Sequence, residues 1–382
     1  MQPSTPLWRT GVLAACAGLL LAASVAWPLP SSWFPAIAQG TAFWWLQPLA
    51  LAVLCRGLQQ ATSLRQAWWT GWIFASTWLV GTFWWLVVAM HVYGGMGAPL
   101  AVFATLLLAA ALALYYALAG LVFWRWSRPR GSRGGAYPPA PASSLLFAAL
   151  WTTAEMARGT WLTGFGWGAV GYAHIDGPLA FYAPWLGIYG LSALAAWLAA
   201  VLAQGLRVRW ALAAFTLLGL PLVLAVPDWT HSTGRLRVSL LQGNVGQSNK
   251  FDAPTVTQSL KGYAAGLAAA QGALVVLPET AIPLLPADWP PGYLESLQAS
   301  LHSKNQSALI GTPWGDARSG YTNAALGLGA GEPAGYRYDK HHLVPFGEFI
   351  PPLFHWFIDL MQIPLGDFNR GPLAAPSFIA QD

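Results

Sequence analysis

Seven long apolar stretches in the first 227 residues limit what this chain can fold into. A membrane-spanning helix needs about 20 mostly apolar residues, because the hydrocarbon core is about 30 Å thick and each residue advances about 1.5 Å. Only 9% of the residues are charged and the mean hydropathy is +0.46, too apolar for an ordinary soluble protein. We therefore predict a membrane α-helical bundle of about seven spans, near residues 11–29, 34–54, 68–90, 98–124, 144–158, 183–204 and 208–226.

The fifth stretch leaves an alternative open. It is short and carries Glu155 and Arg158 at its end. Because charged groups are costly in the bilayer core, six spans with one re-entrant or interfacial segment are also possible.

Arginine predicts the orientation of these spans. Residues 1–227 hold ten Arg, no Lys and two acidic residues. Nine of the Arg fall before the first span or in alternate loops, and cationic residues in short loops stay on the cytoplasmic side. We therefore expect a cytoplasmic N-terminus and, after seven crossings, a water-facing domain at 228–382 outside the cytoplasm. The net charge of +5 belongs to these loops, so we expect no nucleic-acid partner.

The pattern changes to that of an α/β domain from Arg235 onward. β-branched and apolar runs predict strands at 236–241, 273–277 and 307–311, and a hairpin at 323–328 and 336–338. Helical patterns fall between them, at 255–270 and about 293–303. Strands that alternate with helices and then pair in hairpins predict a layered α/β fold.

Three charged residues follow strands or turns of this domain, where a scaffold commonly presents catalytic groups. Glu279 ends an apolar strand, after Leu-Pro. Lys340 opens the run Lys-His-His-Leu-Val-Pro-Phe-Gly-Glu-Phe, which also supplies Glu348. A lone carboxylate at a strand end is more often a helix cap or a surface group than a catalytic base. The surrounding motifs therefore decide between these two interpretations.

These motifs resemble those of the carbon-nitrogen hydrolase (nitrilase) superfamily. They are Gln-Gly-Asn at 242–244, Leu-Pro-Glu-Thr-Ala-Ile-Pro at 277–283 and Tyr-Asp-Lys-His-His-Leu-Val-Pro-Phe-Gly-Glu at 338–348. Behind about seven spans they look like the apolipoprotein N-acyltransferase family. The glycine-rich loop at 164–172 and the Gly-x-Tyr-Gly turn at 187–190 are also typical of that family's membrane part.

The resemblance implies a nitrilase-like αββα sandwich for the second domain and a two-step acyl transfer. In it Glu279 is the general base and Lys340 the cation beside the reacting carbonyl. Glu348 matches the second functional glutamate, and Phe251 stands in a substrate-binding position where the family often has Trp. The implied partners are a phospholipid acyl donor and a diacylated lipoprotein acceptor, with no metal and no cofactor. The resemblance also implies that the protein is a monomer in the bacterial inner membrane, with its catalytic domain in the periplasm.

One part of the family pattern is missing from these 382 residues. The resemblance implies a nucleophilic Cys shortly after Pro376, and no Cys follows Lys340. Cys16 and Cys55 lie in or beside the first two apolar stretches, on the wrong side of the membrane or within it. We therefore expect a C-terminally truncated member that cannot form the acyl-thioester as it stands.

Two other functions remain open from the residues. A membrane-tethered amidase or nitrilase would use the same charged groups on a small soluble substrate. A non-enzymatic channel, transporter or lipid-binding relative would need none of them. The near absence of charge within the spans argues against a transporter, since ion and solute pathways usually need some.

Overall fold

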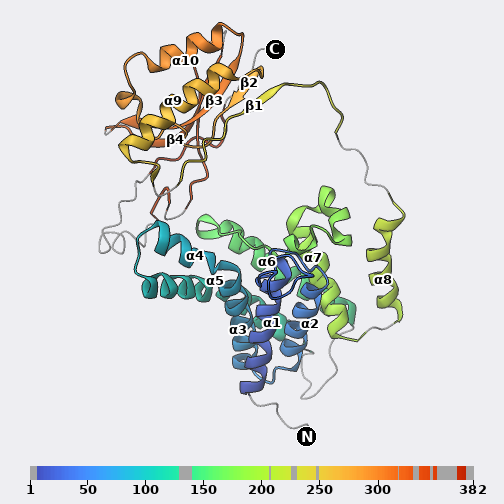
Figure 1. Ribbon diagram of the computed structural model, residues 1–382. Coiled ribbons are helices and arrows are strands. Elements are labelled where there is room, and N and C mark those ends of the chain that lie inside the picture. The colour runs from blue at the N-terminus through green and yellow to red at the C-terminus, as the bar shows by residue number, and fades with distance from the viewer. Residues whose placement is uncertain are drawn as a thin grey trace. The chain divides into compact units, whose positions relative to one another are not determined.

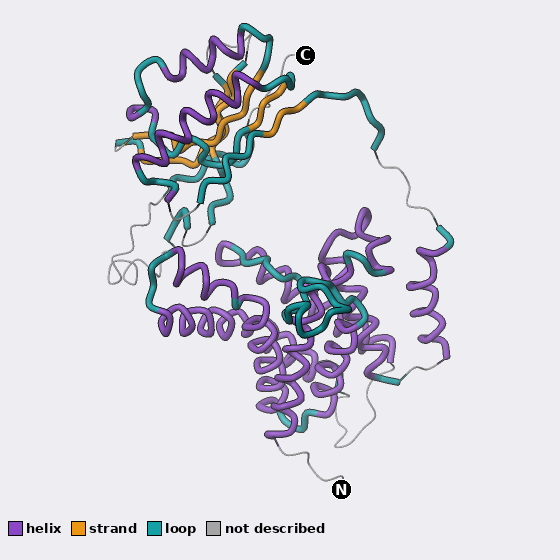
Figure 2. The backbone as a smooth tube through the Cα atoms, in the orientation of Figure 1, coloured by secondary structure: helices purple, strands orange, loops and turns teal. Residues whose placement is uncertain are grey.

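The computed structural model describes residues 7–128, 140–205, 208–224, 230–246, 249–316, 318–329, 335–344, 347–350 and 368–375. The chain divides into two compact units, Met1–Asp228 and Trp229–Asp382. The first is helical and the second is built around a sheet (Figure 1, Figure 2). The strand-end segment expected after Pro376 lies outside the described residues.

Each of the seven predicted apolar stretches overlaps one helix of at least 12 residues in the first unit. These helices are α1 (Leu7–Val25), α2 (Leu46–Gln60), α3 (Leu64–Phe83), α5 (Ala98–Trp126), α6 (Ala140–Thr160), α7 (Ala183–Ala203) and α8 (Val208–Gly219). The short α4 (Trp85–Val88) follows α3.

Length and composition support fewer spans than seven. Among the described residues, three segments can cross a bilayer, namely Trp8–Val25, Ala98–Trp126 and Pro178–Ala203. A fourth is possible if Leu64–Phe83 and Trp85–Tyr93, bent by 48°, form one broken span. Several helices are thus apolar enough to span a membrane, and the count of seven stays a prediction.

The second apolar stretch begins as a loop and not as a helix. We predicted a span from residue 34, but α2 begins only at Leu46. The preceding segment folds back on the end of α1, where Phe43 N donates to Ser24 O over 2.8 Å. Pro35 and Gly40 explain the difference, because proline lacks the N–H that a helix interior needs and the Gly40 φ of 87° does not fit a helix.

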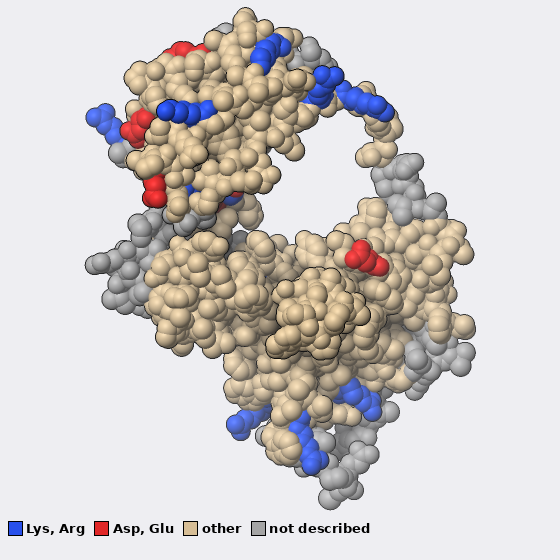
Figure 3. Space-filling view, in the orientation of Figure 1, with Lys and Arg blue, Asp and Glu red and all other residues tan. Residues whose placement is uncertain are grey.

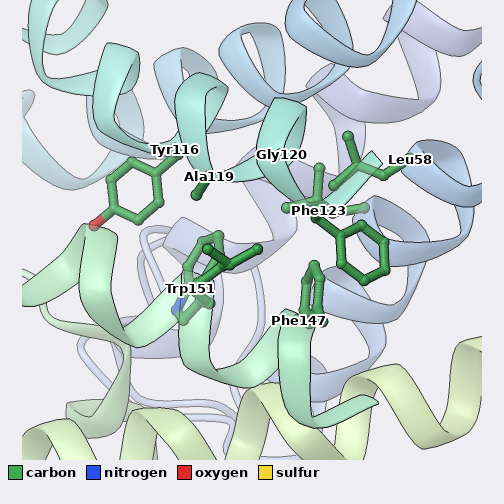
Figure 4. A pocket seen from close by; sticks show the side chains of 9 residues that line it. Leu58, Tyr116, Ala119, Gly120, Phe123, Phe147 and Trp151 are labelled. Atoms are coloured by element: carbon green, nitrogen blue, oxygen red, sulfur yellow. The ribbon is translucent and has the colours of Figure 1, made fainter. Parts of the chain in front are cut away.

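Aromatic side chains from three helices form the core of the first unit. Trp78 of α3 contacts Tyr116 of α5 and Trp151 of α6, with ring centroids 5.1 and 5.6 Å apart. Beside Trp151, apolar side chains such as Phe123 and Phe147 surround a cavity of only about 10 Å³ (Figure 4). That volume is about one water molecule, so this core is closely packed.

The outer surface of the first unit is apolar. Phe103, Leu107 and Leu118 of α5 are each more than half exposed. The few charged side chains on the visible face of this unit are basic groups at its lower end and one acidic group higher up, whereas both signs of charge are scattered over the second unit (Figure 3). An exposed apolar surface of this extent fits a lipid environment.

Arg158, which we placed at the end of the fifth apolar stretch, is buried at the end of α6. Its side chain is among the largest that are fully buried. Nε donates to the Tyr116 hydroxyl over 2.9 Å, and Nη1 donates to the carbonyls of Phe165 and Trp167 over 2.6 and 2.8 Å. These hydrogen bonds offset part of the cost of burying the charge, and they hold the glycine-rich loop against α6.

The second unit holds a five-stranded mixed sheet in the order β1-β2-β3-β4-β5. The strands are β1 (Val238–Leu240), β2 (Leu274–Val276), β3 (Ser307–Asp316), β4 (Gly320–Leu328) and β5 (Tyr336–Asp339). The first three are parallel, and β3, β4 and β5 pair antiparallel. The predicted strands and the hairpin at 323–338 are confirmed.

Two helices cover one face of this sheet. α9 (Ala253–Ala269) connects β1 to β2, and α10 (Tyr293–His302) connects β2 to β3. Parallel neighbours joined by right-handed crossovers place both helices on the same face. Leu267 of α9 and Leu301 of α10 pack there with Val275 and Ile310 of the strands. The described residues form one sheet, so the two-sheet αββα sandwich stays a prediction.

Candidate active site

Glu279 lies in the turn that follows β2, at the carboxyl end of the parallel strands. The turn is tied to β3, since Ile282 N donates to Gly311 O over 3.1 Å. A Cβ on Gly311 would lie 2.4 Å from Pro278 O and 2.7 Å from the Glu279 Cα. Glycine at 311 therefore lets the Glu279 backbone lie directly against β3.

Thr280, the next residue, has a φ of 50°. A non-glycine residue in this left-handed region is strained, and such strain collects at functional sites. The tight turn therefore fixes where the Glu279 side chain begins.

Lys340 follows β5 and is held by its backbone on two sides. Its N–H donates to Asn323 O over 2.8 Å, and its carbonyl accepts from Gly371 N over 3.0 Å. The lysine side chain thus starts from a fixed point beside β4.

The structure brings Glu279, Lys340 and Glu348 together. Lys340 Nζ lies 3.0 Å from Glu279 Oε1 and 2.9 Å from Glu348 Oε1. Residues 61 and 8 positions away in the chain therefore share one ammonium group. The three residues that the sequence assigned to one site form one cluster of charges.

The two glutamates differ in exposure. The Glu279 side chain is 61% exposed, whereas that of Glu348 is 11% exposed. The second oxygen of Glu348 also accepts from Val344 N over 2.7 Å. Glu348 is therefore held by its partners on both oxygens, while the Glu279 side chain stays open to solvent.

Opposing effects set the ionisation of the exposed pair. Partial burial raises the pKa of the Glu279 carboxyl, but the hydrogen bonds from Lys340 and Asn323 and the charges of Lys340 and Lys250 outweigh it, so the pKa falls below 4.5. Burial lowers the pKa of the Lys340 ammonium, but the hydrogen bonds and charges of Glu348 and Glu279 raise it above 10.5. At neutral pH the site holds a carboxylate and an ammonium group.

Phe251 lies in a turn before α9 and is 68% exposed. No described contact joins its ring to the charged cluster, but its neighbour Lys250 donates to Glu279 O over 3.3 Å. The turn that carries Phe251 therefore lies beside the Glu279 turn.

Sequence reasoning missed two residues of this site, Asn323 and Lys250. Asn323 Nδ2 lies 2.5 Å from Glu279 Oε1 and 2.6 Å from Glu348 Oε1. The sequence signal for Asn323 was its place as a single side-chain amide at the start of an apolar strand segment, directly before Ala-Ala-Leu. Both cysteines, Cys16 and Cys55, lie in helices of the first unit.

Comparison with known proteins decides the family. Residues 17–201 match the apolipoprotein N-acyltransferase N-terminal domain. The apolipoprotein N-acyltransferase of Verminephrobacter eiseniae is 45% identical over 388 aligned residues, which cover 96% of this chain and 69% of that protein. The chain belongs to the apolipoprotein N-acyltransferase family.

Other members of this acyltransferase family agree with that assignment. The apolipoprotein N-acyltransferase of Ralstonia nicotianae is 44% identical, over 88% of this chain and 65% of the relative. That of Bordetella bronchiseptica is 38% identical, over 98% of this chain and 73% of the relative. The chain thus spans between about two thirds and three quarters of the length of these acyltransferases.

Proposed function

We propose that this chain carries the base and the oxyanion-stabilising cation of an apolipoprotein N-acyltransferase. The enzyme moves an acyl chain from a phospholipid, through a cysteine thioester, to the amine of a diacylglyceryl-cysteine lipoprotein. The observation that carries the proposal is the exposed Glu279 carboxylate bound to the Lys340 ammonium, in a chain of this family. Both cysteines of the chain lie in the first unit, so the proposal assigns the thiol to neither of them.

In the first step, the Glu279 carboxylate takes the proton of the thiol. A free thiol has a pKa of about 8.5, so it needs a neighbouring base at neutral pH. The thiolate attacks the ester carbonyl, and the Lys340 ammonium stabilises the oxyanion of the tetrahedral intermediate. Collapse of the intermediate breaks the ester bond, and the lysophospholipid alkoxide takes the proton from Glu279.

In the second step, the lipoprotein amine attacks the thioester carbonyl beside the same ammonium group. Glu279 takes a proton from the amine, the carbon–sulfur bond breaks and an amide forms. The thiolate then takes the proton from Glu279, which returns the site to its starting state. Glu348 pairs with Lys340 Nζ over 2.9 Å, which orients the ammonium group and helps to keep it protonated.

The membrane unit gives this chemistry its location. We place about seven spans in the bacterial inner membrane, with a cytoplasmic N-terminus and the second unit in the periplasm. The arginine distribution supports this orientation. Both lipid substrates would be anchored in the same leaflet, so a tethered site needs no lipid extraction. The exposed ring of Phe251 would then contact acyl chains, and the protein would act as a monomer.

The proposal can be tested in a chimeric protein that also supplies the nucleophilic thiol, which we call the thiol-complete protein. We would extend the chain with the C-terminal part of the Verminephrobacter eiseniae relative, which is longer than this chain. Acyl transfer from a tagged phospholipid to a diacylated lipopeptide is measured by mass spectrometry. We expect transfer by the extended protein and a loss of about 10²- to 10⁴-fold in Glu279→Gln and Lys340→Met.

The matched controls are Glu295→Gln and Lys261→Met, which change exposed residues on α10 and α9. Both should leave the rate unchanged. Retained turnover in Glu279→Gln would remove this carboxylate from the role of base. Ammonia release from short amides without lipopeptide acylation would favour the amidase alternative.

A further inference from the structure

Two carboxylates share a single ammonium group in this site. Glu279 Oε1 and Glu348 Oε1 lie 3.0 and 2.9 Å from Lys340 Nζ. Like charges this close repel each other, and one of the pair then tends to bind a proton. A protonated Glu279 could not accept a proton from a thiol. One lysine alone therefore leaves the base exposed to the repulsion of its neighbour.

Asn323 supplies N–H donors that reduce this repulsion. Its Nδ2 lies 2.5 Å from Glu279 Oε1 and 2.6 Å from Glu348 Oε1. A side-chain amide carries two N–H donors on that nitrogen, so each carboxylate receives one. The opposite amide orientation would set a carbonyl oxygen against two negative oxygens. The same two oxygens are thus bridged twice, once by an ammonium and once by an amide.

Strand pairing holds Asn323 in this place. The residue is 9% exposed and lies in β4, opposite Pro313 of β3. Its carbonyl accepts the backbone N–H of Lys340 over 2.8 Å. One residue therefore fixes the root of the lysine through its main chain and both carboxylates through its side chain. A longer or apolar side chain at this register position cannot do both.

We propose that Asn323 is a positioning residue of the acyl-transfer site, which holds Glu279 beside Glu348 so that Glu279 stays available as the base. Its catalytic consequence rests on the proposed function. Its effect on the two carboxylates does not, because it follows from the contacts within the cluster. A residue that only stabilised the hairpin would not affect the protonation of Glu279 by itself.

Site-resolved titration of the 382-residue chain in detergent micelles tests this role. A water-soluble carbodiimide with an amine nucleophile modifies protonated carboxyl groups, and peptide mass spectrometry reports each site. In Asn323→Leu, which removes both donors at similar size, we expect the labelling midpoint of Glu279 to rise by about one pH unit or more. In Asn323→Asp, which adds a third negative charge, we expect a larger rise.

Asp316 is an internal reference in the same hairpin. Its carboxylate accepts from the backbone N–H groups of Arg318 and Ser319 over 2.7 and 2.8 Å, and these bonds hold its pKa below 3.8. A variant that loosened the β3–β4 hairpin would raise the midpoints of both Asp316 and Glu279. The positioning role predicts a rise at Glu279 with Asp316 unchanged.

Asn305→Asp is the matched control for added charge. Asn305 is exposed and precedes β3 at the opposite end of the sheet from the Glu279 turn, since Ser307 pairs with Leu274. This control should leave the Glu279 midpoint unchanged. An unmoved Glu279 midpoint in both Asn323 variants overturns the inference, as does a joint rise with Asp316. Shifted midpoints with no acyl transfer in the thiol-complete protein would count against the proposed function alone.

Discussion

The backbone N–H of Lys340 donates to the carbonyl of Asn323 over 2.8 Å, so the lysine side chain leaves the main chain at a fixed distance from both glutamates. From that root, one compact ammonium group reaches two oxygens at 2.9 and 3.0 Å. An arginine is longer and presents a planar fork, which does not fit a point between two carboxylate oxygens.

Lys340→Arg should therefore lose acyl-transfer activity, although it keeps the positive charge. In the thiol-complete protein we expect a loss of acyl transfer of about 10²-fold or more, close to that of Lys340→Met. Initial rates with a tagged phospholipid measure it, and Lys304→Arg, in the turn after α10, is the control. A Lys340→Arg rate within threefold of wild type would show that charge alone is enough at this position.

The cluster also predicts how stability depends on pH. The pKa of Glu279 is lowered, so its stabilising contribution is complete above pH 4.5 and is lost as the pH falls through the lowered pKa. The pKa of Lys340 is raised, so its contribution is complete below pH 10.5 and is lost as the pH rises through the raised pKa. We expect the difference in thermal midpoint between the chain and Glu279→Gln/Lys340→Met to be constant between these limits.

Scanning calorimetry across the pH range checks this window. Outside it on either side, the difference between the two proteins should shrink, because the wild-type chain loses an interaction that the double variant lacks. A difference that grew towards acid pH would mean that Glu279 binds its proton more tightly when folded than when unfolded, contrary to its hydrogen bonds.

Gly311 should tolerate no side chain. A Cβ there would meet Pro278 O at 2.4 Å and Thr280 N at 2.6 Å, and both are backbone atoms that cannot rotate away. We expect Gly311→Ala to destabilise the second unit by about 1–3 kcal/mol through overpacking, measured by urea unfolding.

Gly262→Ala gives the matched comparison. Gly262 lies within α9, and a Cβ there would meet nothing within 4 Å. Alanine is the better helix former, so this change should stabilise the unit by about 0.5–1 kcal/mol. Equal effects of the two substitutions would contradict the close approach of the Glu279 turn to β3.

The proposed orientation can be tested with single thiols. In a chain with Cys16→Ala and Cys55→Ala, we would place one cysteine at exposed Lys261 of α9 or at exposed Gln60 of α2. A membrane-impermeant maleimide added to spheroplasts should label the Lys261→Cys protein at once. It should label the Gln60→Cys protein only after lysis. The reverse pattern would place the charged cluster in the cytoplasm and end the proposal.

Local patterns explain what the sequence could predict. Glu279 and Lys340 each follow a strand of β-branched or aromatic residues, and strand ends are visible in one dimension. The β4–β5 hairpin and both helices of the second unit follow from the same periodicities. β3 was predicted only to Gly311, because Pro-Trp-Gly at 313–315 looks like the end of a strand, and pairing with β4 carries it on to Asp316.

Tertiary contacts explain what the sequence could not predict. Asn323 joins the site only through the register of β4 with β5 and through residues 44 and 25 positions away. The burial of Arg158 could not be predicted, because its acceptors are the Tyr116 hydroxyl, 42 residues away, and two backbone carbonyls, which no side-chain pattern reveals. Such partners become visible only once the chain is folded.

The burial of Arg158 has a consequence for the order in which the chain can assemble. Two of its acceptors, the carbonyls of Phe165 and Trp167, come seven and nine residues later in the sequence. When α6 has just been synthesised, its guanidinium therefore still needs water or another temporary partner. The helix and the loop that follows it must therefore fold together. A ribosome that stalled between them would leave the Arg158 guanidinium without its two carbonyl acceptors.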